Sequence, residues 1–242
     1  MQVDRAKSII AGTRIVTFDI DLTLAYMDEA VENADRFLFD YVTKYYPELG
    51  ISYQDEIMDM MDELLRSRNF DYKNIGELRK HVLSSFVEKS PYDPSVTEEL
   101  FDVWRKERNK TKLIPYAQEL VELLHNHGFL LGIITNGTAD LSCHPDLNSL
   151  FTAFVNSDLC GDRKPTRVPF DKMKEIMGIY DSSMYMHVGD DYSSDVEGAH
   201  NSGWKSVLIS RSSTPYPQGK KAPDLCVKSL RDLYLLFKAV LE

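Results

Sequence analysis

From residue 113 onward, short apolar runs alternate with longer amphipathic stretches, and this alternation limits the possible folds more than any other feature. Residues 129–135 (FLLGIIT) and 184–190 (MYMHVGD) have the length and apolar content of buried parallel strands. Intervening stretches such as residues 117–128 repeat apolar residues at helical spacing and end at a glycine. A strand–helix–strand order of this kind predicts a parallel sheet with helices on both faces and right-handed connections.

One more strand precedes this alternation by almost a hundred residues. Residues 13–20 (TRIVTFDI) are rich in β-branched residues and predict a buried strand that ends in acidic residues. Residues 26–112 instead contain four apolar stripes at helical spacing, which predict a small helical bundle. We therefore predict an α/β fold: a doubly wound, Rossmann-like parallel sheet formed by residues 1–25 and 113–242, with an inserted helical-bundle domain formed by residues 26–112.

Composition excludes several kinds of partner. With Lys+Arg 28 and Asp+Glu 38, the formal charge is −10, which argues against nucleic-acid binding and against a polybasic membrane anchor. No apolar run approaches the roughly 20 residues of a membrane helix, and the N-terminal stretch is too short in apolar residues for a secretory signal. The three cysteines form no CxxC spacing, so we expect neither a disulfide framework nor a zinc site. These features predict a soluble cytoplasmic protein.

Polar side chains follow three of the predicted strands. Asp19 and Asp21 end the first strand, Thr135 ends a second, and Asp190 ends a third, with Asp195 five residues further on. Ligands of doubly wound sheets bind beyond the carboxyl ends of the strands, so these side chains should share one basin. Crowded carboxylates repel one another and usually indicate a hard cation between them, and oxygen ligands favour Mg²⁺ over zinc.

A lysine adds positive charge to the same predicted basin. Lys164 lies in the segment GDRKP (residues 161–165), between the second and third polar strand ends. A hydroxyl such as that of Thr135, the main-chain amides of a glycine turn and an ammonium group are what a transferring phosphoryl group requires. The set therefore suggests phosphoryl transfer to a carboxylate and then to water.

Four segments carry a family resemblance. FDIDLTL, IITNG, GDRKP and VGDDYSSDVEGAHNSGW occur in this order and resemble the four motifs of the haloacid dehalogenase-like superfamily. The resemblance covers nearly the whole core, and the inserted helices are similar to the superfamily's helical cap in position and type. Phe170, which lies six residues after Lys164, and the small residues Gly198, Ala199 and Gly203 extend the match.

The resemblance implies catalytic roles for the strand-end residues. Asp19 would be the nucleophile and would form an aspartyl-phosphate. Asp21 would protonate the leaving alcohol and later activate water. Thr135 would hydrogen-bond the phosphoryl group with the amide of Asn136 nearby, and Lys164 would hold Asp19 and the phosphoryl group together by its charge.

The resemblance also implies a Mg²⁺ site. Its ligands would be Asp19, the main-chain carbonyl of Asp21, and Asp190, with water completing an octahedron. Asp195 would support the surroundings of Asp190 from behind. Asp191 lies beside Asp190, and spacing does not separate their roles, although capping or a supporting contact is favoured for Asp191 over metal binding.

Together these features lead us to expect a Mg²⁺-dependent phosphatase that acts on a small phosphorylated metabolite. Dehalogenating and phosphonate-cleaving relatives lack an acid two residues after the nucleophile, because an alkyl halide needs no proton to leave. Asp21 therefore favours a phosphatase over a dehalogenase. A phosphomutase would keep both acids and stays open, as does a non-catalytic binding protein on the same fold. The sequence does not select the substrate or the oligomeric state.

The chain departs from the family pattern at two places, and its helical insert is expected to move. Leu22 stands where many relatives carry glycine or aspartate, so we expect a turn of different shape after Asp21. The stretch from Gly137 to Lys164 is about one helical turn shorter than in typical capped relatives, which puts the helix after Thr135 in question. We expect the helical insert to move as a lid about linkers near residues 26–29 and 109–113.

Overall fold

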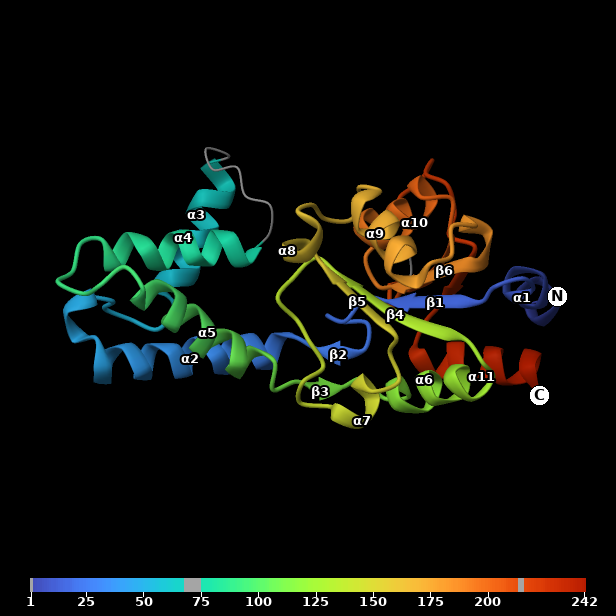
Figure 1. Cartoon of the computed structure of the whole chain (residues 1–242), viewed down its shortest axis with the longest axis horizontal. Coiled ribbons are helices and arrows are strands. Elements are labelled where there is room, and N and C mark those ends of the chain that lie inside the picture. Colours follow the sequence, from blue (N-terminus) through green and yellow to red (C-terminus); the bar gives the residue numbers. More distant parts are fainter. Residues whose placement is uncertain (1, 68–74, 213–215) are drawn as a thin grey trace. The chain divides into compact units, whose positions relative to one another are not determined.

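A computed structural model of the chain describes residues 2–67, 75–212 and 216–242 and divides into two compact units (Figure 1). The α/β unit comprises Met1–Tyr26, Lys112–Asn136 and His144–Glu242, and the helical unit comprises Met27–Thr111 and Gly137–Cys143. The sequence-based division placed residues 137–143 with the sheet, whereas the structure groups them with the helices. That the helical unit acts as a cap stays a prediction.

A parallel six-stranded sheet forms the centre of the α/β unit, with the strand order β5-β4-β1-β6-β7-β8. The doubly wound sheet predicted from the sequence is confirmed. β1 lies between β4 and β6, so the chain leaves it in both directions and creates the switch point at which such sheets bind ligands. The strands are β1 (Ile15–Phe18), β4 (Leu130–Thr135), β5 (Ala153–Asn156), β6 (Tyr185–Gly189), β7 (Lys205–Ile209) and β8 (Leu225–Val227).

Helices cover both faces of this sheet. In Figure 1, α9 and α10 lie on one face, and α6 and α11 lie on the other. All residues of β1 and β6 are therefore buried, which explains why both strands are mostly apolar. α1 packs on α11 and was not predicted. The helices of this unit are α1 (Gln2–Ile10), α6 (Ala117–Asn126), α7 (Pro145–Asn148), α8 (Ser157–Cys160), α9 (Val168–Met177), α10 (Glu197–Asn201) and α11 (Leu230–Leu241), with the short helical turns η2 (Ser182–Met184) and η3 (Tyr192–Val196).

A small antiparallel pair that the sequence did not reveal joins the two linkers to the helical unit. β2 (Ala25–Tyr26) pairs with β3 (Lys112–Leu113), so the outgoing and returning chains lie side by side. In the turn that leads into β2, Leu22 has a φ of 59°, a left-handed conformation that favours glycine. The turn after Asp21 therefore has the backbone of a glycine turn although it contains a leucine.

Among the described residues of the helical unit there are four helices, as the apolar stripes predicted: α2 (Asp28–Tyr45), α3 (Glu56–Ser67), α4 (Ile75–Val87) and α5 (Val96–Arg108), with the short turn η1 (Pro47–Leu49). The stripes pack into one core that includes Leu38, Leu83 and Leu100. A buried ion pair crosses this core, where Arg79 donates to Asp35 over 2.7 Å. The unit therefore has a hydrophobic core of its own.

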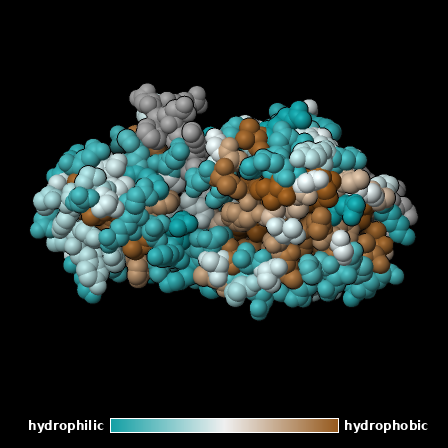
Figure 2. Space-filling view, viewed as in Figure 1, coloured by the Kyte–Doolittle hydropathy of each residue, from teal (hydrophilic) through white to brown (hydrophobic). Residues whose placement is uncertain are grey.

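Hydrophobic residues gather on the visible face of the α/β unit more than on that of the helical unit (Figure 2). Leu159 of α8 and Ile176 of α9 are among the exposed apolar side chains of this unit. No described helix is long and apolar enough to cross a membrane. The cytoplasmic location predicted from the sequence stays a prediction.

Candidate active site

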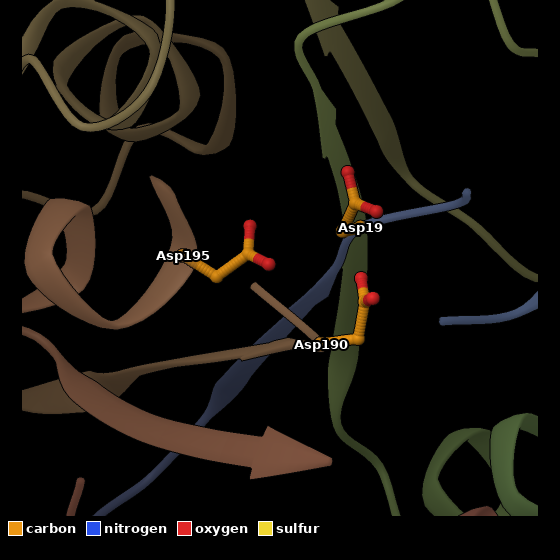
Figure 3. Close-up of side chains that lie close together, drawn as sticks. All are labelled: Asp19, Asp190 and Asp195. Atoms are coloured by element: carbon orange, nitrogen blue, oxygen red, sulfur yellow. The ribbon is translucent and has the colours of Figure 1, made fainter. Parts of the chain in front are cut away.

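Three aspartates meet at the carboxyl end of the central strands, as the sequence predicted for strand-end residues (Figure 3). Asp19 follows β1, Asp190 follows β6, and Asp195 lies in η3, the turn after β6. The register of the sheet explains the meeting, because Phe18 pairs with Val188 and the amide of Asp19 donates to the carbonyl of Val188 over 2.9 Å. Carboxylate oxygens of Asp19, Asp190 and Asp195 lie within 4.8 Å of one another.

Lys164 connects two of these carboxylates. Its ammonium group donates to Asp19 over 2.8 Å, to Asp195 over 2.7 Å and to the carbonyl of Ile134 over 2.7 Å. The lysine is 2% exposed, so its charge is hardly screened by solvent. An ammonium group has three protons, and these three partners use all of them. Lys164 is therefore held in one position against Asp19.

The Asn136 side chain holds the main chain of Lys164. Its Oδ1 accepts from the amide of Lys164 over 2.7 Å, and its Nδ2 donates to the carbonyl of Lys164 over 2.9 Å. The sequence assigned Asn136 to phosphate binding next to Thr135, which is buried at the end of β4. Phosphate binding by the main-chain amide of Asn136 stays a prediction, and the side chain has the further task of fixing the lysine loop.

Asp195 is locked from several directions. Its Oδ1 accepts from Lys164 and its Oδ2 accepts from the amide of Asp191 over 3.0 Å. Gly189 leaves room for it, because a Cβ at that position would lie 2.1 Å from the carboxylate of Asp195. Since both oxygens of Asp195 are engaged with the protein, its supporting role predicted from the sequence fits this geometry better than metal binding.

His187 and Thr17 belong to the same buried network, and the sequence did not reveal them. His187 Nε2 lies 3.2 Å from Asp195 Oδ1, and His187 Nδ1 lies 2.8 Å from Thr17 Oγ1. Burial lowers the pKa of His187, so the ring is neutral. Because an ionised carboxylate only accepts hydrogen bonds, Nε2 carries the proton and Nδ1 accepts from Thr17. The signal in the sequence is a polar ring inside an apolar strand, since buried polar groups must find partners.

Charge in the network divides unequally among the acids. Burial raises the pKa of Asp19 to about 8, against the opposing charge of Lys164. Burial followed by the charge of Asp195 raises the pKa of Asp190 to about 6. Burial alone would raise the pKa of Asp195 as well, but Lys164 and the hydrogen bond from His187 lower it below the usual range. The charge of Lys164 is thus balanced by Asp195, and no second buried cation balances Asp19 and Asp190 among the described residues of the cluster. We call these two carboxyl groups the acidic surplus of the site.

Two further predicted residues complete the site. Asp190 is oriented by Thr23, whose hydroxyl donates to its Oδ1 over 3.2 Å. Asp21 lies in the turn that precedes β2, and its carboxylate is not part of the close group of three. This is compatible with the role predicted for its side chain, which needs to reach a leaving group rather than the cation.

We expect His187→Leu to lower kcat about 10- to 100-fold while the protein still folds, because Asp195 then loses a donor that orients it toward Lys164. His187→Gln places a terminal N–H near the same carboxylate and should recover most of this loss. Steady-state kinetics on both variants, with thermal unfolding as the control, makes the comparison. Equal turnover by the folded leucine variant and the wild type would show that His187 only packs in the core and does not orient Asp195.

Comparison with known proteins agrees with this geometry. The family described as haloacid dehalogenase-like hydrolase matches residues 16–209. A phosphoserine phosphatase of Thermus thermophilus is 28% identical over 164 residues, 66% of this chain but 65% of that protein, so the match spans slightly less than two thirds of the relative's length. A phosphoglycolate phosphatase of Aquifex aeolicus is 26% identical over 205 residues, 81% of this chain and 84% of that protein.

A solved structure shares the same arrangement. The crystal structure of a 2-haloacid dehalogenase from Pseudomonas syringae pv. Tomato DC3000 superposes with a TM-score of 0.80 and 27% sequence identity, covering 94% of this chain and 99% of that chain. The family match includes β4, β6, β7 and β1 from Val16 onward, and with them every residue of the network around Lys164. The chain therefore belongs to the haloacid dehalogenase-like hydrolase family and is a hydrolase.

Proposed function

We propose that this hydrolase is a Mg²⁺-dependent phosphatase that releases phosphate from a small phosphomonoester through an aspartyl-phosphate at Asp19. The main support is the buried Lys164 ammonium, which lies 2.8 Å from Asp19 within an all-oxygen acidic cluster. A fixed positive charge beside a carboxylate is what a nucleophile needs when it attacks an anionic phosphoryl group. Three relatives named as phosphatases point to the same chemistry: the two described above and a glyceraldehyde 3-phosphate phosphatase of Pyrococcus abyssi.

In the first step, a carboxylate oxygen of Asp19 attacks phosphorus and the ester bond to the leaving alcohol breaks. Asp21 gives its proton to the departing oxygen, so a neutral alcohol leaves. Lys164 and the hydroxyl of Thr135 stabilise the charge that develops on the phosphoryl oxygens.

In the second step, water attacks the phosphorus of the aspartyl-phosphate. Asp21, now deprotonated, accepts the proton of the water, and the bond from Asp19 to phosphorus breaks. Inorganic phosphate leaves and both carboxyl groups return to their starting states. Asp195 and His187 act throughout by keeping Lys164 in position, since they contact the lysine network rather than the reacting atoms.

The donor set fits Mg²⁺. Asp19 and Asp190 supply oxygen atoms and carry the acidic surplus, and oxygen-only sites favour this hard cation. The ligands would be the carboxylates of Asp19 and Asp190 with the main-chain carbonyl of Asp21. When bound, the cation would offset negative charge on the phosphoryl oxygens and on Asp19.

A dehalogenase is the second candidate, because the P. syringae structure of that name is 27% identical and covers nearly the whole chain. In that reaction Asp19 would attack carbon and displace halide, and no proton donor would be needed. Asp21 is the feature that favours the phosphatase, since an acid two residues after the nucleophile has a use in ester cleavage.

A substrate panel separates the candidates. Purified protein with Mg²⁺ should hydrolyse p-nitrophenyl phosphate and at least one of phosphoserine, phosphoglycolate and glyceraldehyde 3-phosphate, the substrates in the names of three relatives. It should release no halide from 2-chloropropionate. Halide release without phosphate release would replace our proposal with the dehalogenase, transfer of phosphate between sugar positions would indicate a mutase, and inactivity on every compound would favour a binding protein.

A further inference from the structure

The segment after the Thr135 motif leaves the α/β unit. Residues 137–143 fold with the helical unit, and the chain returns to the α/β unit at His144. The chain therefore passes between the two units four times, after residues 26, 111, 136 and 143, and not only at the two linkers expected from the sequence. Two of the four passages flank this one segment. The connection that directly follows Thr135 and Asn136 is thus part of the helical unit.

A reciprocal pair of hydrogen bonds holds this segment to the end of α5. Asn109 follows α5 and is 3% exposed. Its Nδ2 donates to Asp140 Oδ2 over 2.8 Å, and its Oδ1 accepts from the amide of Asp140 over 3.2 Å. The neighbouring apolar side chains of Ala139 and Leu141 are each 1% exposed. Hydrogen bonds and burial therefore fix the segment to the helical unit around Asp140.

Asn136 is fixed just as firmly to the α/β unit. Its side chain makes two hydrogen bonds to the main chain of Lys164, over 2.7 and 2.9 Å. Asp140 is four positions after Asn136, and such a length of chain spans at most about 14 Å. Because both ends are anchored, a displacement of the helical unit must be absorbed within this short tether or transmitted to the residues beside Lys164.

We propose that Asn109 and Asp140 are positioning residues that couple movement of the helical unit to the phosphate-binding loop of Thr135 and Asn136. This inference rests on the proposed function, because it gives that loop its role. Any coupling of this kind is reciprocal, so an anion at the loop also biases the helical unit. Helical insert and catalytic loop then change position together instead of the insert moving freely about two linkers.

An exchange of the two side chains tests the link. Asn109→Asp alone brings two carboxylates to a distance that now holds a hydrogen bond, so the pair should break. In the double variant N109D/D140N, an amide again faces a carboxylate, and residue 109 can still accept from the amide of residue 140. Glu99→Gln on the same helix, where Glu99 accepts from Tyr41 and Tyr46, is the matched control for a carboxylate-to-amide change away from the link.

Hydrogen exchange in the absence of ligand is the first readout, and it does not depend on activity. N109D should speed exchange at residues 137–141 and also at Thr135 and Asn136 in the α/β unit, the double variant should restore both, and E99Q should change neither. Faster exchange confined to residues 137–141 would mean that the pair merely anchors its own segment, and our inference would be wrong. Unchanged exchange in N109D would overturn it as well.

Kinetics and a phosphate analogue supply the second readout. N109D should lower kcat on p-nitrophenyl phosphate about tenfold, with a smaller change in KM, because a misplaced loop costs more in the transition state than in binding. Beryllium fluoride with Mg²⁺ should slow exchange at Thr135 in the wild type and, through the link, at residues 105–111; the second effect should vanish in N109D. Protection at Thr135 without protection at residues 105–111 contradicts the link. No protection at Thr135 contradicts the proposed function, and the ligand-free comparison still decides the link.

Discussion

Asp19→Asn should reduce turnover of phosphomonoesters at least about a thousandfold and leave the fold intact. An amide is a poor nucleophile, and without Asp19 no carboxylate beside Lys164 is placed to attack phosphorus. Lys164 keeps two of its partners in this variant, Asp195 and the carbonyl of Ile134, so the lysine should remain ordered. Steady-state assays with circular dichroism and thermal unfolding measure both parts of the expectation.

The stability of this variant should show how much the ionised carboxylate of Asp19 destabilises the folded state. The pKa of Asp19 is raised to about 8, so the folded state binds this proton more tightly than the unfolded state does. The stability of the wild type in chelator should therefore fall as pH rises from about 4 to about 8. D19N lacks this titration and should unfold at the same or a higher temperature than the wild type at pH 8.

Asp171→Asn is the matched control for this variant, because the Asp171 side chain on α9 is half exposed and makes no contact with the acidic cluster, its ion-pair partner being Lys174. It should keep wild-type turnover, since the change lies outside the site. Wild-type-like turnover in a pure preparation of D19N would remove the nucleophile from our account.

Removal of divalent cations is the second large effect. Excess EDTA should lower turnover at least about a hundredfold, because several kcal/mol of charge stabilisation disappear at Asp19 and the phosphoryl group. Mg²⁺ should restore it, and Ca²⁺ should do so poorly, since Ca²⁺ accepts longer bonds and more ligands. Asp190→Asn should raise the Mg²⁺ concentration that gives half of the maximal rate. Full activity in chelator, or activity with zinc alone, would contradict an oxygen-only magnesium site.

Much of the site could be predicted because it depends on a general property of parallel sheets. Thr135 ends a strand, Asp19 and Asp190 each follow one directly, and adjacent strands bring their carboxyl ends to one edge. Lys164 could be placed in the same basin because it lies between two polar strand ends, but its contact with Asp19 was implied only by the family motif, since a lysine before a proline has no special position by spacing alone. In the structure, the GDRKP segment and the end of β1 lie together, and Lys164 contacts Asp19 there.

Other features depend on contacts that no local pattern encodes. His187 lies in an apolar strand and reads as core until its neighbours Thr17 and Asp195 are placed around it. Residues 137–143 were assigned to the sheet because they follow a strand, and their packing with the helical unit depends on Asn109, far away in the sequence. The roles of these residues depend on partners that are distant in the sequence, so no local pattern reveals them.

The most direct test of the central claim is to trap the covalent intermediate on Asp19. Asp21→Asn removes the base that activates water, whereas p-nitrophenolate leaves without a proton, so this variant should form the aspartyl-phosphate and hydrolyse it slowly. Acid quenching after mixing with p-nitrophenyl phosphate and Mg²⁺, reduction with borohydride and tandem mass spectrometry then read the modified residue. We expect a burst of p-nitrophenolate and homoserine at position 19. A burst with unmodified Asp19, or with the modification on another residue, would contradict the account.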